Sequence, residues 1–225
     1  WTNASIVASL TGTNQTNSGY IFLPKTPELS GYDADGNQTN DGRFSYTWDA
    51  ENRMLQAQSL STSPTASTRK VTWQFDGGGR RLRQITYDGS SGTYVPTEDL
   101  KFVNNGWQCV AELNGTNNTT LRTYLWGLDL SGSMIGAGGV GGLLAINSAS
   151  GGISLHAYDG NGNVVALVAA NGTKSATYEY DPFGRILRSS GTAASDNTYR
   201  FSTKRANTTT DFALYEYRPL FNGRW

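Results

Sequence analysis

The run that best fits a cofactor site is glycine-rich, from Gly136 to Gly141, and it matches the spacing G-x-G-x-x-G. Asp159 follows at a distance where dinucleotide-binding proteins place an acidic residue. Such a site also needs a preceding strand, a following helix and a βαβ unit. Here the run is followed by Leu-Leu-Ala-Ile-Asn and further glycine. We therefore predict a tightly packed loop or sheet bend, and no bound cofactor.

Two short polar runs could hold calcium. Residues 33–37 and 159–163 both place Asp or Asn at the first, third and fifth positions. An EF-hand loop also needs glycine at its sixth position and glutamate at its twelfth. The first run has Gln38 and Phe44 at those positions, and the second has Val and Ala. We favour turns bonded through Asx side chains over calcium loops, and we predict no metal site.

Side chains suited to catalysis are few. His156 is the only histidine and lies in a strand-like pattern, and Cys109 is the only cysteine, which excludes an internal disulfide. We expect a packed or surface histidine and a small buried hydrophobic residue. Glycoside hydrolysis needs a carboxylate pair, and nothing singles out two of the 18 acidic residues. The prediction is a protein that is not an enzyme.

The composition limits the class of protein. Lys+Arg and Asp+Glu both number 18, so the balanced charge gives no indication of nucleic acid as a partner. No apolar run approaches the roughly 20 residues that span a bilayer. Only 16% of residues are charged, while Gly, Thr, Ser and Asn are abundant. This profile predicts an all-β, turn-rich protein of one large or two small domains. Because the sequence begins at Trp1, we expect a processed product or a piece of a longer chain.

An aromatic residue followed by Asp recurs at the ends of strand-like runs. Asp can accept hydrogen bonds from turn amides, and a following Gly or Asn supplies the left-handed turn position, as Gly184 does after the last pair. We predict that Arg53, Arg80 and Arg185 each pair with a neighbouring turn Asp and thereby link adjacent hairpins. The six pairs are Tyr32-Asp33, Trp48-Asp49, Phe75-Asp76, Tyr87-Asp88, Tyr158-Asp159 and Tyr180-Asp181.

Alternating apolar and polar residues predict strands at 44–48, 71–75, 107–113 and 121–126, and no amphipathic helix of useful length is present. The apolar run 164–169 and the alternating run 176–180 flank Asn171-Gly172, which predicts a hairpin with a type I′ turn. Residues 1–29 show no clear period, and we read them as an extended arm or edge segment.

The ordered motifs Tyr180-Asp-Pro-Phe-Gly-Arg185, Phe201-Ser202 and Gly223-Arg-Trp225, with the earlier aromatic-Asp turns, resemble the YD-repeat or RHS-repeat family over about residues 30 to 225. The resemblance implies stacked β-hairpins forming a curved or spiralling sheet strip that winds into a hollow shell. The family includes secreted toxins, toxin-complex cocoons and teneurins. We expect an arm at 1–29, YD-repeat hairpins at 30–156 and an RHS-associated core at 157–225. In toxin members a self-cleavage segment and a payload follow the core, and this sequence stops at Trp225, before either.

The acceptor pattern Asn-x-Ser/Thr is more frequent than composition alone predicts. Several copies fall at predicted hairpin tips, where a covalent glycan would fit. The alternative is ordinary turn asparagines in a Thr-rich protein. The candidate positions are Asn3, Asn14, Asn37, Asn114, Asn117, Asn118, Asn171 and Asn207.

A strip of hairpins has two open ends with unpaired amides and carbonyls, which must pair with something. Our first hypothesis is an extracellular or cell-surface scaffold whose copies assemble head to tail into a fibre. The second is the C-terminal fragment of an RHS shell around a secreted toxin, with the remainder of a longer chain as partner. The third is a glycan-binding module that uses the alternating aromatic residues.

Overall fold

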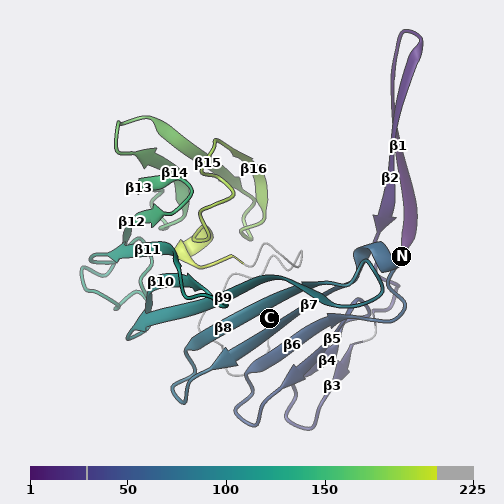
Figure 1. Ribbon diagram of the computed structural model, residues 1–225, viewed down its shortest axis with the longest axis horizontal. Helices are drawn as coiled ribbons and strands as arrows, with labels where there is room; N and C mark the ends of the chain where they lie inside the picture. Colours follow the sequence, from purple (N-terminus) through teal and green to yellow (C-terminus); the bar gives the residue numbers. More distant parts are fainter. Residues whose placement is uncertain (29, 207–225) are drawn as a thin grey trace. The chain divides into compact units, whose positions relative to one another are not determined.

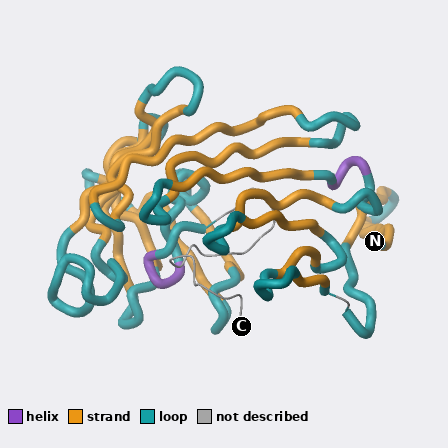
Figure 2. The backbone as a smooth tube through the Cα atoms, turned by 90° about the horizontal axis from the view of Figure 1, so that it is seen from below, coloured by secondary structure: helices purple, strands orange, loops and turns teal. Residues whose placement is uncertain are grey.

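The computed structural model describes residues 1–28 and 30–206. Almost every element is a strand, and the two helical turns, η1 (Thr65–Ser67) and η2 (Phe201–Thr203), are three residues long (Figure 2). No helix in the described part of the chain is long and apolar enough to cross a bilayer. The strands are β1 (Thr2–Leu10), β2 (Thr13–Ile21), β3 (Gly31–Tyr32), β4 (Gln38–Asn40), β5 (Phe44–Trp48), β6 (Met54–Ser59), β7 (Arg69–Phe75), β8 (Arg81–Asp88), β9 (Val95–Asn105), β10 (Gln108–Asn114), β11 (Thr120–Trp126), β12 (Leu143–Ser148), β13 (Gly152–Tyr158), β14 (Val164–Ala169), β15 (Lys174–Tyr180) and β16 (Ile186–Ser190).

The order of the strands is the simplest one available. β3 to β16 form one 14-stranded sheet in which each strand lies beside its neighbours in sequence, and the sheet does not close, since β3 and β16 stand at its ends. Tight turns impose this order, because antiparallel neighbours can be joined by a few residues. The predicted all-β fold of stacked hairpins is confirmed.

The described residues divide into two compact units, which we treat separately. The first takes in Trp1–Trp73 and Ile85–Glu98, and the second takes in Gln74–Gln84 and residues 99–206. In the first unit, Phe44 and Tyr46 of β5, Ala57 of β6 and Val71 and Trp73 of β7 are buried. They occupy alternate strand positions, so one face of these strands forms a core.

The second unit has two apolar clusters on one face of its strands. The first contains Leu100, Phe102, Leu143 and Ile146, together with Tyr199 from the segment that follows the last strand. The second packs Val164, Leu167, Ala176 and Tyr178 of β14 and β15 against Ala194 of that same segment. Residues beyond β16 therefore complete the core of this unit.

The hairpin β1–β2 is a sheet of its own, with unbroken register from Thr2↔Ile21 to Leu10↔Thr13. Figure 1 shows it standing apart from β3 to β6 of the same unit. Its base is fixed by aromatic contacts: Trp1 meets Phe22 edge to face at 5.5 Å, and the Arg43 guanidinium lies 5.5 Å from the Trp1 ring centre. The sequence predicted an extended arm here, and the regular pairing of its two strands was not foreseen.

The turn between β14 and β15 differs from the type I′ turn that we predicted. The Gly172 N–H donates to Ala169 O, the Ala169 N–H donates to Thr173 O, and Gly172 has a φ of 83° whereas Asn171 does not have a positive φ. This is a type I turn followed by a left-handed residue, the arrangement of a G1 bulge. One left-handed position is enough here, so glycine takes it and asparagine stays in the ordinary region.

Candidate functional site

Five of the aromatic-Asp pairs begin turns of one geometry. In each, the Asp N–H donates to the carbonyl four residues on, and the residue three positions on donates its N–H back to the Asp carbonyl. One oxygen of the Asp carboxylate then accepts the backbone N–H groups two and four residues further along. The turns begin at Asp33, Asp49, Asp76, Asp159 and Asp181, and their left-handed residues are Gly36, Asn52, Gly79, Gly162 and Gly184.

In three of these turns an arginine pairs with the Asp of its own turn and not with a neighbouring turn Asp, which corrects our prediction. Arg80 also donates to Gly106 O, in the turn between β9 and β10, at 3.5 Å. Arg53 Nε lies 2.6 Å from the Asp49 carboxylate, and Arg80 Nε lies 2.6 Å from that of Asp76. Arg185 reaches Asp181 of its own turn at 3.3 Å. Arginine pairs with its own turn because the turn is tight, so the residue four positions after the Asp lies directly opposite the Asp. Asn takes the same role in the other two turns, where its amide donates to the carboxylate.

The pair Tyr87-Asp88 departs from this geometry. The Asp88 carboxylate accepts the Ser90 N–H and hydroxyl and pairs with Arg69 on the preceding strand at 2.7 Å. Conversely, Asp129 has no aromatic residue before it, yet its N–H donates to Ser133 O and Gly132 takes the left-handed position. This turn was not predicted from the sequence, because only Asp residues that follow an aromatic residue were taken as turn starts.

The aromatic residues provide the links between hairpins. Trp48 Nε1 on β5 donates to Gln38 O on β4 at 2.8 Å, and the Tyr180 hydroxyl on β15 donates to Val164 O on β14 at 2.7 Å. Tyr158 on β13 reaches Leu143 O on β12 in the same way. Each ring therefore ties the end of one strand to the start of the strand before it.

Residues 193–206, which we call the core strap, bind one face of the second unit. The Val164 N–H donates to Arg200 O, and the Ser202 N–H donates to Asn163 Oδ1 at 2.8 Å. Thr203 Oγ1 donates to Gly162 O at 2.8 Å. The strap thus binds at the turn that begins with Asp159 and at the strand that follows it.

A buried carboxylate holds the other end of the strap. Glu112 on β10 is fully buried and pairs with Arg205 of the strap at 2.9 Å and with Arg122 on β11 at 2.8 Å. Arg122 also pairs with Asp196 of the strap at 3.0 Å. Burial favours protonation of Glu112, but the two guanidinium groups outweigh it and lower the pKa of Glu112. The pairs cannot be broken singly without leaving a buried charge.

The sole histidine also contacts the strap. His156 Nε2 lies 3.2 Å from Asn197 Oδ1, and the ring stacks on Tyr158 with centres 6.2 Å apart. Burial lowers the pKa of His156 to about 4 despite the hydrogen bond to Asn197 Oδ1, so the ring is neutral at neutral pH. Asn197 is itself buried and bonded to Tyr199, so the ring helps to fix the strap.

Cys109 borders a cavity of about 160 Å³ together with Arg81, Trp126 and Arg205. Burial, with Glu112 nearby, raises the pKa of the Cys109 thiol to about 12, so it carries no thiolate at neutral pH. Polar residues also line the cavity, among them Asn104, Gln108 and Lys204. This arrangement offers no activated nucleophile.

The glycine-rich run lies in the loop between β11 and β12, with no helix after it. Its amides are hydrogen-bonded within the protein: the Asp129 carboxylate accepts the N–H groups of Ala137 and Gly139 at 2.7 and 3.1 Å. Burial tends to raise the pKa of Asp129, and these bonds together with those from Ser131 lower it to about 2. In residues 33–37 and 159–163 the first Asp is similarly bonded to its own turn. Among the described residues no three His, Cys, Asp or Glu side chains gather as metal ligands.

The candidate glycan acceptors occupy different environments. Asn3 and Asn14 are exposed on β1 and β2, and Asn117, Asn118 and Asn171 are exposed in turns. Asn114 is half-buried at the end of β10. Asn37 is the exception, since it is buried and its amide donates to Asp33 and Asn52, which leaves no room for a glycan. Asn207 lies outside the described residues.

A family model described as RHS Repeat matches residues 158–198, which run from Tyr158 and its Asp159 turn into the core strap. The chain therefore carries an RHS repeat in this region. It is 28% identical over 182 residues to the tRNA3(Ser)-specific nuclease WapA of Bacillus spizizenii (strain DSM 15029 / JCM 12233 / NBRC 101239 / NRRL B-23049 / TU-B-10), and 27% identical to the tRNA nuclease WapA of Bacillus subtilis (strain 168). Each match covers 78% of the RHS chain and 6% of the relative.

Solved structures share its fold. The crystal structure of TcdB2-TccC3-Cdc42 matches 86% of the RHS chain and 9% of its own, with a TM-score of 0.60 and 19% identity. The crystal structure of TcdB2-TccC3 matches 84% and 9%, with a TM-score of 0.56 and 18% identity. The RHS chain thus spans less than a tenth of these proteins, and the nuclease activity in the relatives' names is a property of those whole proteins.

Proposed function

We propose that this chain is a wall segment of an RHS shell, a non-enzymatic container around a secreted payload. The observation that carries the proposal is the unbroken order of β3 to β16, together with the apolar clusters and the strap on one face of the second unit. Such a strip adds strands without changing its construction, so a longer chain would extend the same wall. The likeness to the TcdB2-TccC3 structures supports a shell over the head-to-tail scaffold that we placed first.

Under this proposal the partner is the remainder of a longer RHS chain and the site of action is extracellular. We also propose domain boundaries at residues 29 and 156, and covalent glycans at exposed acceptors such as Asn171. Fibre assembly remains the second candidate. It draws support from the two end strands, whose outer edges need partners. The glycan-binding module is the third candidate.

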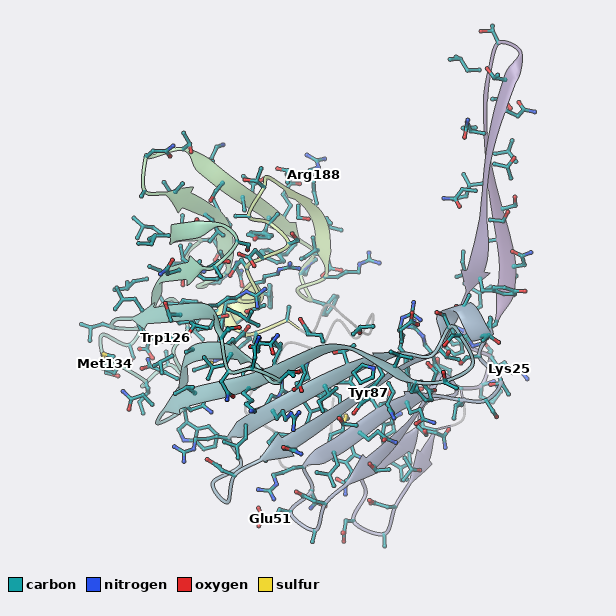
Figure 3. All side chains as sticks on the ribbon, viewed as in Figure 1. Lys25, Glu51, Tyr87, Trp126, Met134 and Arg188 are labelled. Atoms are coloured by element: carbon teal, nitrogen blue, oxygen red, sulfur yellow. The ribbon has the colours of Figure 1, made fainter. Side chains whose placement is uncertain are left out.

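Protease protection of the natural polypeptide that carries this chain tests the container. A payload enclosed by the wall should survive trypsin for at least about tenfold longer than the same payload separated from it. The variant Glu112→Gln, which removes the buried carboxylate that Arg205 and Arg122 share, should abolish most of that protection. Glu179→Gln is the matched control, because Glu179 is exposed and pairs with the exposed Arg188 (labelled in Figure 3). Equal digestion of the enclosed and separated payload contradicts the proposal.

A further inference from the structure

The cavity that Cys109 borders lies wholly within the second unit. Its wall is formed by the end of β7 and the turn after it, by β8 to β11, by the loop between β11 and β12 and by the core strap. Its volume of about 160 Å³ is close to the roughly 150 Å³ of an engineered cavity that holds one benzene molecule. The space therefore suits a ligand with one small ring.

Aromatic side chains make up much of this wall. Trp126 and Tyr199 meet edge to face with ring centres 5.5 Å apart, and Trp126 Nε1 donates to Cys109 O at 2.7 Å. Tyr199 is buried, whereas Trp107 is 46% exposed. A ligand that enters beside the exposed indole thus meets rings fixed by the core, and such rings favour a flat apolar body. The rings that line the cavity are Phe75, Phe102, Trp107, Trp126 and Tyr199.

The glycine-rich loop closes one side of the cavity. A Cβ atom at Gly139 would come within 3.2 Å of the Trp126 ring, and one at Gly138 within 3.4 Å of Lys204 Nζ. Lys204 Nζ also donates to Gly138 O at 2.7 Å. Both glycines have a positive φ, which a residue with a side chain rarely adopts. Glycine therefore lets the loop backbone approach the ring and the lysine, so the run that resembled a cofactor motif forms part of this wall.

The charged groups of the wall are all cationic. Among the residues that the structure describes, no Asp or Glu lines the cavity. Two of the cations have carboxylate partners set back from the cavity, Asp76 for Arg80 and Glu112 for Arg205. A ligand in the cavity therefore meets positive groups directly and the negative ones only behind them. The cationic lining residues are Arg80, Arg81, Lys204 and Arg205.

Two of the guanidinium groups share one aromatic ring. Those of Arg81 and Arg205 lie 5.8 and 5.0 Å from the centre of the Phe102 ring. Burial, and then the charge of Arg205, lower the pKa of Arg81 to about 9, so Arg81 is still charged at neutral pH. Like charges so placed repel each other. An anion held between the two groups would offset this repulsion and accept hydrogen bonds from both.

We propose that this cavity binds a small aromatic carboxylate, with its ring against Trp126 and Tyr199 and its carboxylate between Arg81 and Arg205. A neutral ring leaves the repulsion in place, and an anion without a ring leaves the aromatic wall uncovered, so tight binding needs both parts. The site needs only the second unit. It does not depend on whether the wall encloses a payload, and failure of either proposal leaves the other measurable.

Isothermal titration calorimetry of the intact chain with three probes tests the proposal. Benzoate has the ring and the charge, benzamide has the ring alone, and acetate has the charge alone. Benzoate should bind with a dissociation constant of about 1 mM or lower, and the other two at least about tenfold more weakly. A chain that does not bind benzoate overturns the proposal, and so does benzamide or acetate binding as tightly as benzoate.

A charge variant tests the position of the carboxylate. Arg81→Gln should weaken benzoate binding at least about tenfold, because it removes a charged hydrogen-bond donor, and should leave benzamide binding unchanged. Arg188→Gln is the matched control, because Arg188 is exposed on β16 and does not line the cavity. Circular dichroism checks that both variants fold. Benzoate that binds Arg81→Gln as tightly as the wild type overturns the proposal.

The tryptophan indoles locate the ligand in the wild type, with no need for a variant. In NMR spectra of chain labelled with ¹⁵N-tryptophan, benzoate should shift the indole N–H signals of Trp107 and Trp126. The signal of Trp48 should stay in place, because Trp48 lies in the first unit and donates to Gln38 O. Benzoate that binds without shifting the signal of Trp126 occupies another site, and this result also overturns the proposal.

Discussion

The hairpins β1–β2 and β15–β16 are both antiparallel pairs joined by a turn with a left-handed glycine, Gly12 in the first and Gly184 in the second. Only the second is integrated into a core. Its turn begins with an Asp that accepts backbone amides, and its Tyr180 donates to the neighbouring strand. In the turn of the first hairpin, Thr13 Oγ1 donates weakly to Leu10 O at 3.3 Å, and nearly all residues of β1 and β2 are exposed.

The difference teaches that strand pairing alone does not place a hairpin in this sheet. Three additions do so: the Asp turn, the aromatic link to the preceding strand and, in the second unit, the strap across one face of the strands. Each addition can be removed by one substitution in the repeat hairpins, where stability should fall, while the same kind of change outside them should have little effect.

The strap should give the largest effect. Glu112→Gln leaves Arg205 and Arg122 without their shared carboxylate in a buried site, and should lower the free energy of unfolding by about 3–5 kcal/mol. Urea denaturation measures this. Glu179→Gln, on an exposed pair, should change it by less than about 0.5 kcal/mol. Equal losses from the two variants contradict a strap held by buried charge.

The pH dependence comes next. The folded pKa of His156 is about 4, below its usual value of 6.5, so between these values the unfolded chain binds the proton and the folded chain does not. Stability should therefore fall as pH falls from 6.5 to 4, by roughly 2–3 kcal/mol. Thermal unfolding across this range should show the slope, and His156→Gln should flatten it. Carboxylates with lowered pKa, such as Asp129 at about 2, add their own loss of stability only below about pH 5, so the slope above that pH reports on His156. An unchanged slope in the variant rules out this role.

The Asp turn should contribute less. Asp49→Ala removes an acceptor for the Glu51 and Arg53 amides and should cost about 1–2 kcal/mol in urea denaturation. Glu51→Ala is the control in the same turn, because Glu51 is exposed at its tip (Figure 3) and should cost less than about 0.5 kcal/mol. The reverse order of the two losses would show that the turn does not depend on the Asp carboxylate.

The aromatic link should give the smallest measurable loss. Tyr180→Phe keeps the ring and removes the hydroxyl that donates to Val164 O, and should cost about 0.5–1.5 kcal/mol. Tyr32→Phe at the exposed end of the sheet is the control and should be neutral. A loss that is the same for both tyrosines would remove the distinction between linked and end hairpins.

The sequence predicted what is local. The alternation of apolar and polar residues places Phe44 and Tyr46 in a core, and this alternation can be read within a single strand. It could not show the contacts between residues distant in sequence, such as Arg205 with Glu112, because nothing near either residue marks the other. The predicted partner of the turn arginines was wrong for a related reason. Spacing along the sequence does not show whether an arginine pairs with the Asp of its own turn or with the Asp of a neighbouring turn. Asp129 was missed because its turn is held by glycine-loop amides and needs no aromatic link before it.

Cryo-electron microscopy of the natural polypeptide that carries this chain tests the shell most directly. The account predicts β3 to β16 within the wall of a hollow particle, with the strap on the inner face and density for a payload in the lumen. A map in which both faces of these strands meet solvent, or in which they pack into a solid fibre with no lumen, would contradict it.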